Sequence, residues 1–385
     1  METNYDIIIC GGGPSGSTCA LTFKGSDARV LVIDKNEFPR EKVCGDGIAP
    51  YASKVLRKID PEFEQSYKEF KEKFPIKRVK IGSNNSTIAT LKLREEFVVS
   101  TRYHFDYFLY EEALKLPNVK FSCGEQIKDV ERTEQGISVK TDKCTYTGKM
   151  VIGCDGATSL VRRKLSSSTV NPESQYAAVR AYFSGVKDMQ MDCFEVYHFK
   201  QFPVAYLWVF PSGKDQANVG FGTFSNIVSE RRLDLKKLVF ETINMRPDLK
   251  ERFAHAKLES DVKGWSIPSS YGEFPISGDR FLLCGDAAGI ADPSTGEGIG
   301  PAMVSGRIAG FQARACFEKN DFTAEALKEY DVEMENKFGK LFRRRRWAVR
   351  VAERNPWIVN LIVRIAKSSS FFADKADPLL ARFFS

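Results

Sequence analysis

The stretch GGGPSG, residues 11–16, constrains the fold of this 385-residue chain more than any other segment. An apolar run, YDIIIC, comes directly before it and is suited to a buried parallel strand. A helical segment follows, and a second apolar run, RVLVID, ends at Asp34. This order of strand, glycine-rich turn, helix and strand is the βαβ unit that binds dinucleotides. The chain is therefore predicted to begin with a Rossmann-like α/β domain.

Each glycine of this turn has a physical role in holding a dinucleotide. Gly11 permits the tight turn, Gly13 lets the backbone approach a pyrophosphate, and Gly16 lets the helix pack on the strand. The helix amino terminus offers free N–H groups and a positive dipole end to the phosphates. Asp34 can accept hydrogen bonds from an adenosine ribose. The candidate cofactor-binding residues of this unit are Gly11, Gly13, Ser15, Gly16, Asp34 and Lys35.

Two later stretches also combine an apolar strand with a turn of glycine and aspartate. In KMVIGCDGATSLVRRKL, residues 149–165, a strand runs into the pair Asp155–Gly156, and a basic helix is predicted to follow. In residues 279–310 a strand ends at the pair Gly285–Asp286, and a long helix is predicted to start near Gly298.

Together, GGGPSG, CDGATS and CGDAAG followed by GEGI resemble the FAD-dependent oxidoreductases of the para-hydroxybenzoate hydroxylase fold group, over residues 4 to 310. The resemblance implies that FAD is the cofactor, that Asp286 bonds its ribityl chain, and that the helix after GEGI points its amino terminus at the flavin. A positive dipole end there would stabilise a reduced flavin. The segment STRYHFDYFLYEEAL resembles the family's Arg-x-x-Phe-Asp-x-x-Leu helix, whose arginine, here Arg102, lies against the cofactor; a surface ion pair is the alternative. The further cofactor-binding candidates are Cys44, Gly45, Arg102, Ile127, Asp155, Gly156, Asp286, Gly298 and Ile299.

Alternating apolar and polar residues characterise the segments between residues 166 and 269, such as CFEVYHF and QANVGFGTF, which predicts antiparallel strands. Residues 78–94 are predicted to form another hairpin. We expect an antiparallel-sheet substrate domain inserted into the FAD-binding domain, an α/β fold that is α+β overall. The predicted FAD-binding domain comprises residues 1–75, 100–165 and 270–330, the sheet domain comprises 76–99 and 166–269, and a helical basic segment comprises 331–385.

Three aromatic residues alternate along one predicted strand. Tyr206, Trp208 and Phe210 face the same side of it, either as part of the sheet's own core or as an apolar wall over the flavin that binds substrate. The segment FPVAYLWVFPSG resembles the Tyr-x-Trp-x-Phe-Pro motif of the geranylgeranyl reductase family. That resemblance implies reduction of isolated double bonds in isoprenoid chains with FAD.

The loop KVCGDG, residues 42–47, resembles the Lys-x-Cys-Gly/Ala-x-Gly loop of the same reductases, which lies next to the isoalloxazine ring. Its glycines would let the backbone pass close to a flat ring. Cys44 and Gly45 are therefore the catalytic candidates, with Cys44 as a proton donor. The alternative is a buried, inert cysteine. Flavin-dependent halogenases have a Gly-Glu-Ser loop and a Trp-x-Trp-x-Ile-Pro strand, and this chain has neither.

Three functions fit these motifs. The first is an FAD-dependent oxidoreductase that passes hydride from reduced flavin to a C=C bond of an isoprenoid or another long apolar molecule. The second is an FAD-dependent monooxygenase, or a halogenase-related enzyme, of the same fold. The third is a non-catalytic protein that binds prenyl groups, as the GDP-dissociation inhibitors do with a related fold. The electron donor is expected to be NAD(P)H or a reduced carrier protein.

Composition indicates whether to expect a metal site, an oxidising compartment or an association with a membrane. Nine scattered cysteines without a C-x-x-C pair, and three histidines, argue against a metal site and suit reduced thiols in the cytoplasm. We expect no signal peptide and no transmembrane helix. Residues 337–385 carry 12 Lys/Arg and 3 Asp/Glu, a net charge of +9, among tryptophans. Such a segment either lies peripherally on the anionic inner face of a membrane or packs as a helical cap on the FAD-binding domain. Nucleic-acid binding is not expected, because no recognition fold is evident.

Overall fold

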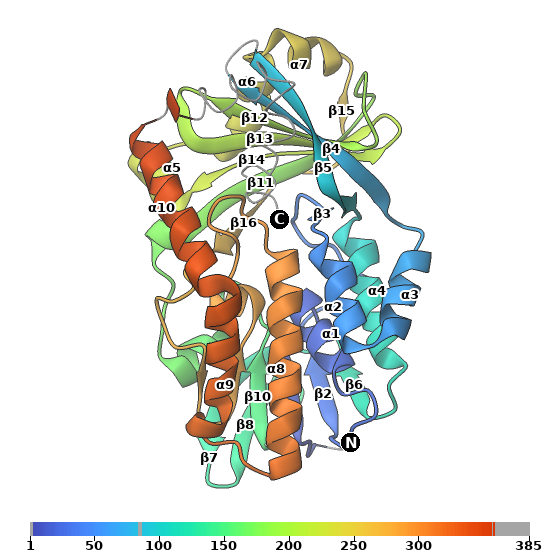
Figure 1. The fold of residues 1–385 in the computed structure, drawn as a ribbon, viewed down its shortest axis with the longest axis vertical. Coiled ribbons are helices and arrows are strands. Elements are labelled where there is room, and N and C mark those ends of the chain that lie inside the picture. Colours follow the sequence, from blue (N-terminus) through green and yellow to red (C-terminus); the bar gives the residue numbers. More distant parts are fainter. Residues whose placement is uncertain (1–2, 84–86, 356, 359–385) are drawn as a thin grey trace.

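The computed structural model describes residues 3–83, 87–355 and 357–358. These residues form three sheets, one of six strands, one of nine and one of three. In Figure 1 the six-stranded sheet and its helices occupy the lower half of the molecule, and the nine-stranded sheet crosses the upper half. The chain crosses between the halves more than once, so each half combines segments that are far apart in sequence.

The six-stranded sheet is the core of the lower half. Its strands are parallel except for the antiparallel pair β17–β18. Every residue of β1, β2 and β10 is buried, which explains why their sequences are continuous apolar runs rather than alternating ones. In sheet order the strands are β17 (Ser277–Gly278), β18 (Phe281–Leu283), β10 (Met150–Gly153), β1 (Ile7–Cys10), β2 (Val30–Ile33) and β6 (Val119–Ser122).

Helices pack around this sheet, and two of them meet at small residues. The predicted long helix is confirmed as α8, which begins at Ile299 after Gly298. It packs on α1 so closely that a Cβ at Gly306 would lie 2.1 Å from the Ser15 carbonyl oxygen. The helices of this half are α1 (Pro14–Leu21), α2 (Tyr51–Ile59), α3 (Pro61–Glu69), α4 (Arg102–Leu114), α8 (Ile299–Lys319) and α9 (Ala324–Met334). The three-stranded sheet comprises β7 (Ile127–Thr133), β8 (Gly136–Thr141) and β9 (Thr145–Gly148).

The nine-stranded sheet contains the predicted hairpin as β4 and β5, but it is not wholly antiparallel. The pair β4–β12 is parallel, with Arg78 opposite Cys193. These strands belong to separate segments of the chain, so no tight turn sets their relative direction. The KVCGDG loop also continues into a two-residue strand, β3, at the sheet edge, where sequence analysis expected only a loop. In sheet order the strands are β15 (Lys257–Leu258), β11 (Gln175–Ser184), β14 (Gln216–Phe224), β13 (Phe202–Gly213), β12 (Cys193–Phe199), β4 (Phe74–Ser83), β5 (Thr87–Val99) and β3 (Gly47–Ile48), and β16 (Lys263–Pro268) pairs with β11.

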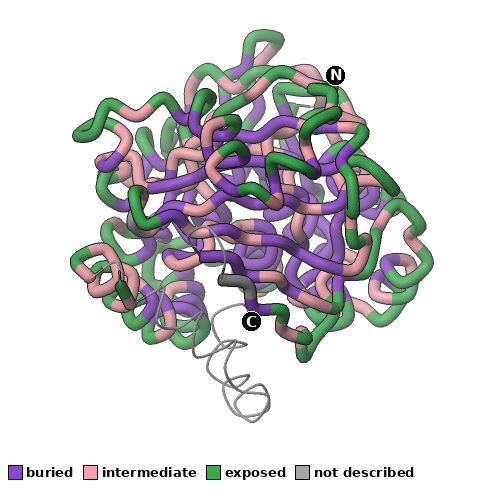
Figure 2. Tube along the Cα trace, turned by 90° about the horizontal axis from the view of Figure 1, so that it is seen from above, coloured by how far each residue is buried: buried purple, intermediate pink, exposed green. Residues whose placement is uncertain are grey.

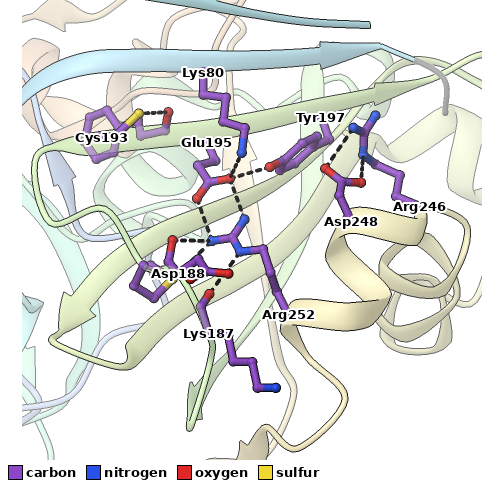
Figure 3. Close-up of polar contacts among 11 residues, drawn as sticks. Lys80, Lys187, Asp188, Cys193, Glu195, Tyr197, Arg246, Asp248 and Arg252 are labelled. Atoms are coloured by element: carbon purple, nitrogen blue, oxygen red, sulfur yellow. Dashed lines mark hydrogen bonds and ion pairs between the residues drawn. The ribbon is translucent and has the colours of Figure 1, made fainter. Parts of the chain in front are cut away.

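A buried charge network ties this sheet to one of its helices. Arg252 donates to both carboxylate oxygens of Glu195 at 2.8 Å. Lys80 on β4 lies 3.2 Å from the same carboxylate, and the Tyr197 hydroxyl donates to it. Figure 3 shows these side chains converging on Glu195. The helices of this half are α5 (Ser225–Glu230), α6 (Leu235–Asn244) and α7 (Pro247–Arg252).

Buried residues follow the strands through the interior of the molecule, and exposed residues lie on the periphery (Figure 2). After α9, a single irregular turn at residues 335–339 leads into α10 (Lys340–Arg354), which runs from the lower half to the upper half in Figure 1. All nine cysteines are free thiols. No helix among the described residues has the length and apolar character that crossing a bilayer requires. Residue 356 and residues 359–385 of the predicted C-terminal segment, 331–385, lie outside the described residues.

Candidate active site

A cavity of about 1120 Å³ lies between the two large sheets. Parts of the chain that are distant in sequence line it, including the β1–α1 turn, the KVCGDG loop, β13 and α10. Gly16 is the one predicted site residue that does not line it, because it packs beneath the turn, where a Cβ would lie 1.8 Å from the Gly11 carbonyl oxygen. The predicted residues that do line it are Gly11, Gly13, Ser15, Asp34, Lys35, Cys44, Gly45, Arg102, Ile127, Asp155, Gly156, Tyr206, Trp208, Phe210, Asp286, Gly298 and Ile299.

The end of the cavity at the glycine turn is built to receive an anion. Gly13 begins α1 without a side-chain cap, so the helix dipole and its first N–H groups face the turn. A Cβ at Gly13 would have only the Arg40 guanidinium near it, at 3.5 Å. The buried Nε of Arg40 has no hydrogen-bond partner among the described residues. The guanidinium also pairs with Asp106 at 3.0 Å, and its Nε lies 4.0 Å from Asp34 Oδ1. A buried cation with one N–H that makes no hydrogen bond to the described residues, beside an open helix terminus, fits a pyrophosphate. Nothing local in the sequence marks Arg40.

Asp34 and Arg102 contact neighbouring residues as well as the cavity. Asp34 accepts a 2.8 Å hydrogen bond from the backbone N–H of Gly12, which fixes the carboxylate at the end of β2. Arg102 is buried, not a surface ion pair, and donates to Asp106 at 2.6 and 2.7 Å. Burial alone would raise the pKa of the Asp106 carboxyl, but the guanidinium groups of Arg102 and Arg40 hold it below its usual value.

The Asp155 carboxylate is hydrogen-bonded within its own loop. Its carboxylate accepts hydrogen bonds from Ser159 Oγ at 2.5 Å and from the backbone N–H of Leu160 at 2.6 Å. The basic helix expected after it is present but short, residues 160–166, and it is π-helical from Arg162 to Ser166, where Arg162 turns inward. Arg162 donates to the Ala287 carbonyl oxygen at 2.9 Å and so ties this loop to the one that carries Asp286. Asp155 thus shapes the cavity wall, and the role of Arg162 could not be read from its position in a basic run.

The glycines of the KVCGDG loop allow close contact with aromatic side chains. A Cβ at Gly45 would lie 3.4 Å from Trp208 Nε1, and one at Gly47 would lie 3.2 Å from the Phe194 ring. The sequence predicts that these glycines let the backbone approach a flavin, and the protein neighbour that they meet is the aromatic wall. Cys44 is half-buried between this wall and Arg102.

The wall itself comes from β13. Tyr206, Trp208 and Phe210 all line the cavity, and the Tyr206 hydroxyl donates to the Thr295 carbonyl oxygen at 2.5 Å. Phe210 packs on Phe194 with ring centroids 4.1 Å apart. On another side, α10 contributes Trp347 and small residues such as Ala348 to the lining. This side of the cavity is therefore apolar.

Helix α10, within the described part of the basic segment, packs on the lower half through one face and leaves the opposite face exposed. Arg345 forms a buried ion pair with Asp292, and Arg346 donates to the Tyr271 carbonyl oxygen at 2.9 Å, so one face caps the lower half. Trp347 on the other face lines the cavity and is 69% exposed, and Arg343 is also exposed.

Comparison with known proteins identifies the family. The sequence profile described as "FAD binding domain" matches residues 4–307. The chain belongs to the FAD-binding domain family. The predicted FAD cofactor is thereby confirmed, and the residues described above fit it. A digeranylgeranylglycerophospholipid reductase from Methanocella arvoryzae is 29% identical over 352 residues, covering 88% of this chain and 85% of the relative. One of the same name from Thermoplasma acidophilum is 28% identical over 362 residues, with the same coverage.

Solved structures with this architecture include a reductase-like protein and a flavin-dependent brominase. A geranylgeranyl bacteriochlorophyll reductase-like protein from Thermoplasma acidophilum has a TM-score of 0.83 at 24% identity, covering 97% of this chain and 95% of its own. The flavin-dependent brominase Bmp2 has a TM-score of 0.76 at 18% identity, covering 100% and 95%. The predicted fold class and the resemblance to geranylgeranyl reductases are confirmed.

Two acidic groups of this FAD-binding protein have raised pKa values: Glu297 in the cavity lining, and Asp46, which is buried within the KVCGDG loop. Burial raises the pKa of Glu297, beside the amino terminus of α8, to about 7, although the Gly300 N–H donates to it at 2.7 Å. Burial likewise raises the pKa of Asp46 to about 6. Neither residue was singled out from the sequence, because burial of a polar side chain in a loop leaves no local pattern.

Proposed function

We propose that this protein is an FAD-dependent reductase that saturates C=C bonds of an isoprenoid or another long apolar lipid. One observation carries the proposal: a single cavity joins the dinucleotide turn to Cys44 and to the aromatic wall. The names of the digeranylgeranylglycerophospholipid reductases to which the chain is similar support the isoprenoid class. A cavity of this volume with apolar walls suits a flexible hydrocarbon chain better than a small polar substrate.

The residues that would hold FAD divide by the part of the cofactor they meet. Gly11, Gly13 and the amino terminus of α1, with Arg40, would bind the pyrophosphate, and Asp34 the adenosine ribose. Asp286 would accept from a ribityl hydroxyl, and the start of α8 at Gly298 would face the ring. The bound cofactor, once reduced, supplies the hydride.

The substrate would be oriented by the wall and protonated by the loop. Trp208 and its neighbours exclude water and align the alkene. Burial raises the pKa of the Cys44 thiol, and the nearby Arg102 charge opposes that shift only in part. The thiol is therefore protonated at neutral pH and can give its proton to the carbon opposite the one that receives hydride.

A spectroscopic turnover experiment tests this function. Purified protein is reduced under anaerobic conditions with dithionite and mixed with a geranylgeranylated phospholipid. Reoxidation of the flavin, with a product heavier by two hydrogen atoms per bond, is the expected result. Oxygen uptake that depends on an aromatic substrate would instead identify the monooxygenase alternative. Tight lipid binding without any flavin reoxidation would favour the non-catalytic prenyl-binding alternative.

We further propose peripheral attachment to an anionic cytoplasmic membrane face through α10. Arg343, Trp347, Arg350 and Arg354 recur at helical spacing and are exposed, as an interfacial helix requires. Trp347 also lines the cavity, so a docked helix would bring the cavity to the lipid surface.

NAD(P)H or a reduced carrier protein would supply the electrons.

A further inference from the structure

Asp46 occupies an unusual position inside the KVCGDG loop. It has a left-handed backbone with φ of 63° and none of its surface is exposed. The Tyr182 hydroxyl donates to its Oδ2 at 2.5 Å, and Asn218 Nδ2 donates to the same oxygen at 2.8 Å. Its Oδ1 is buried and has no partner among the described residues. A buried carboxylate with one orphaned oxygen is costly, which indicates a role beyond packing.

Asn218 joins this carboxylate to the two residues that flank the substrate side. Its Nδ2 also donates to the Cys44 carbonyl oxygen at 2.8 Å, and its Oδ1 accepts from Trp208 Nε1 at 3.0 Å. The amide thereby uses both of its N–H hydrogens and its oxygen. One side chain on β14 sets the distance between the loop and the wall, and Asp46 orients that side chain.

The charge of Asp46 also reaches the thiol. Besides burial and the Arg102 charge, which act on the Cys44 pKa most strongly, an ionised Asp46 raises it and the Asp46 backbone N–H lowers it. The other charged or titratable groups around Asp46 are Tyr182 and Arg180 on β11, Arg102 on α4, and Glu41 and Lys42 in the same loop.

We propose that Asp46 is a positioning residue: through Asn218 it holds the Cys44 loop against Trp208 and, while ionised, it adds to the effect of burial in disfavouring loss of the Cys44 proton. The part played by the thiol in turnover rests on the proposed function, but the control of its protonation by Asp46 does not. The ionised carboxylate disfavours a second negative charge on the neighbouring sulfur, so the loop presents a proton donor and not a thiolate. Protonation of Asp46 would remove both the charge and the stronger acceptor for Asn218.

The proposal can be tested on the FAD-loaded protein without lipid. The rate of Cys44 alkylation by iodoacetamide is measured against pH, with mass spectrometry of the peptide that contains residues 42–47. Asp46→Asn keeps the shape and removes the charge, so the midpoint of its alkylation profile is expected at lower pH, with about tenfold faster alkylation below the wild-type midpoint. Asp261→Asn, at an exposed loop carboxylate outside the network, is the matched control.

Two further variants separate charge from accessibility. Asn218→Ala releases the loop but keeps the Asp46 carboxylate, so the limiting alkylation rate should rise without a downward shift of the midpoint. Asp46→Gly also removes the charge and suits the left-handed backbone at this position, so a shift in the same direction as in Asp46→Asn is expected. This second variant keeps the test available if Asp46→Asn loses FAD or fails to fold.

An unchanged alkylation midpoint in both Asp46→Asn and Asp46→Gly would overturn the proposal and show that Asp46 has only a packing role. That result would have no bearing on the proposed function, which is tested by lipid reduction in the wild-type protein. Conversely, a shifted midpoint in a protein that reduces no isoprenoid lipid would support the role of Asp46 and contradict the reductase.

Discussion

The indole of Trp208 on β13 lies directly over Gly220 on β14. A Cβ at Gly220 would come within 2.1 Å of Trp208 Cζ2, and the two residues are register partners in the sheet. The indole therefore lies flat on the strand, and its N–H is directed to Asn218. The aromatic wall depends on the absence of a side chain at one position of the neighbouring strand.

This contact predicts that Trp208→Ala and Gly220→Ala act on the same property. The first removes the indole and the second displaces it, so both should change the KM or the chain-length preference for lipid substrates while FAD remains bound. Gly264→Ala on β16 is the control, since a Cβ there meets Val179 at an ordinary 3.4 Å. The measurement is turnover of isoprenoid lipids of different chain lengths. If Trp208→Ala keeps the wild-type KM and chain-length preference, the aromatic wall does not contact the substrate.

A second prediction concerns Cys44. Cys44→Ser keeps the shape of the side chain but replaces the thiol by a hydroxyl that gives up its proton far less readily. The variant should bind FAD, melt near the wild-type temperature and accept electrons from dithionite, yet lose reduction of the lipid. Single-turnover flavin reoxidation measures this. If Cys44→Ser reoxidises its flavin with lipid at the wild-type rate, Cys44 has only a packing role.

Asp286 is predicted to contribute to cofactor retention. Asp286→Ala removes the acceptor for a ribityl hydroxyl, and a hydrogen bond to a charged group contributes roughly 1.5–3 kcal/mol, which is roughly a tenfold to hundredfold change in Kd. Ultrafiltration with FAD fluorescence gives the dissociation constant. Asp279→Ala, at a largely exposed carboxylate, should retain FAD like the wild type. Equal retention in both variants would place the ribityl chain elsewhere.

The Glu195 network predicts a dependence of stability on pH. Although burial raises the Glu195 pKa, Arg252 and Lys80 hold it below the usual value for a glutamate. The folded protein therefore binds fewer protons at this site than the unfolded chain, and the stability that the ionised group contributes is present above pH about 4.3 and lost below it. The difference in unfolding free energy between the wild type and Glu195→Gln should narrow as pH falls through that range. A constant difference in denaturant titrations would contradict the pairing.

Removal of the cationic partner should be more costly. Arg252→Met leaves a buried carboxylate incompletely paired and is expected to lower the free energy of unfolding by about 3–5 kcal/mol. The exposed pair Lys237–Glu241 on α6 provides the comparison, because Lys237→Met should cost less than about 1 kcal/mol. Similar losses in the two variants would mean that the buried network adds no more than a surface pair.

Membrane attachment predicts a salt-sensitive interaction with anionic vesicles. Substitution of Arg343, Arg350 and Arg354 by glutamine should weaken the free energy of vesicle binding, measured by co-sedimentation, by about 1 kcal/mol per residue. Salt should also reduce wild-type binding, because charge attraction is screened over about 10 Å at 0.1 M. Binding that persists at high salt or in the triple variant would exclude an electrostatic dock. The matched control replaces exposed lysines of the upper half, Lys236, Lys237 and Lys250.

Several features could be predicted from the sequence because short-range patterns determine them. The glycine turn and the buried strands around it depend on residues within one βαβ unit, so Gly11, Gly13 and Asp34 stand out locally. The alternation of Tyr206, Trp208 and Phe210 places them on one face of a strand, since side chains in a strand repeat every second residue.

The tertiary structure alone decided which groups meet across the cavity. Arg40 reaches the glycine turn, Arg162 joins two loops, and Asn218 links Asp46 to Trp208, although no spacing in the chain marks any of them. The parallel pairing of β4 with β12 is likewise set by sheet packing and not by a turn. A local pattern determines the direction of a side chain relative to its own element. The partner of a buried polar group depends on which distant segment covers it, and that is settled only when the two sheets and α10 close around one cavity.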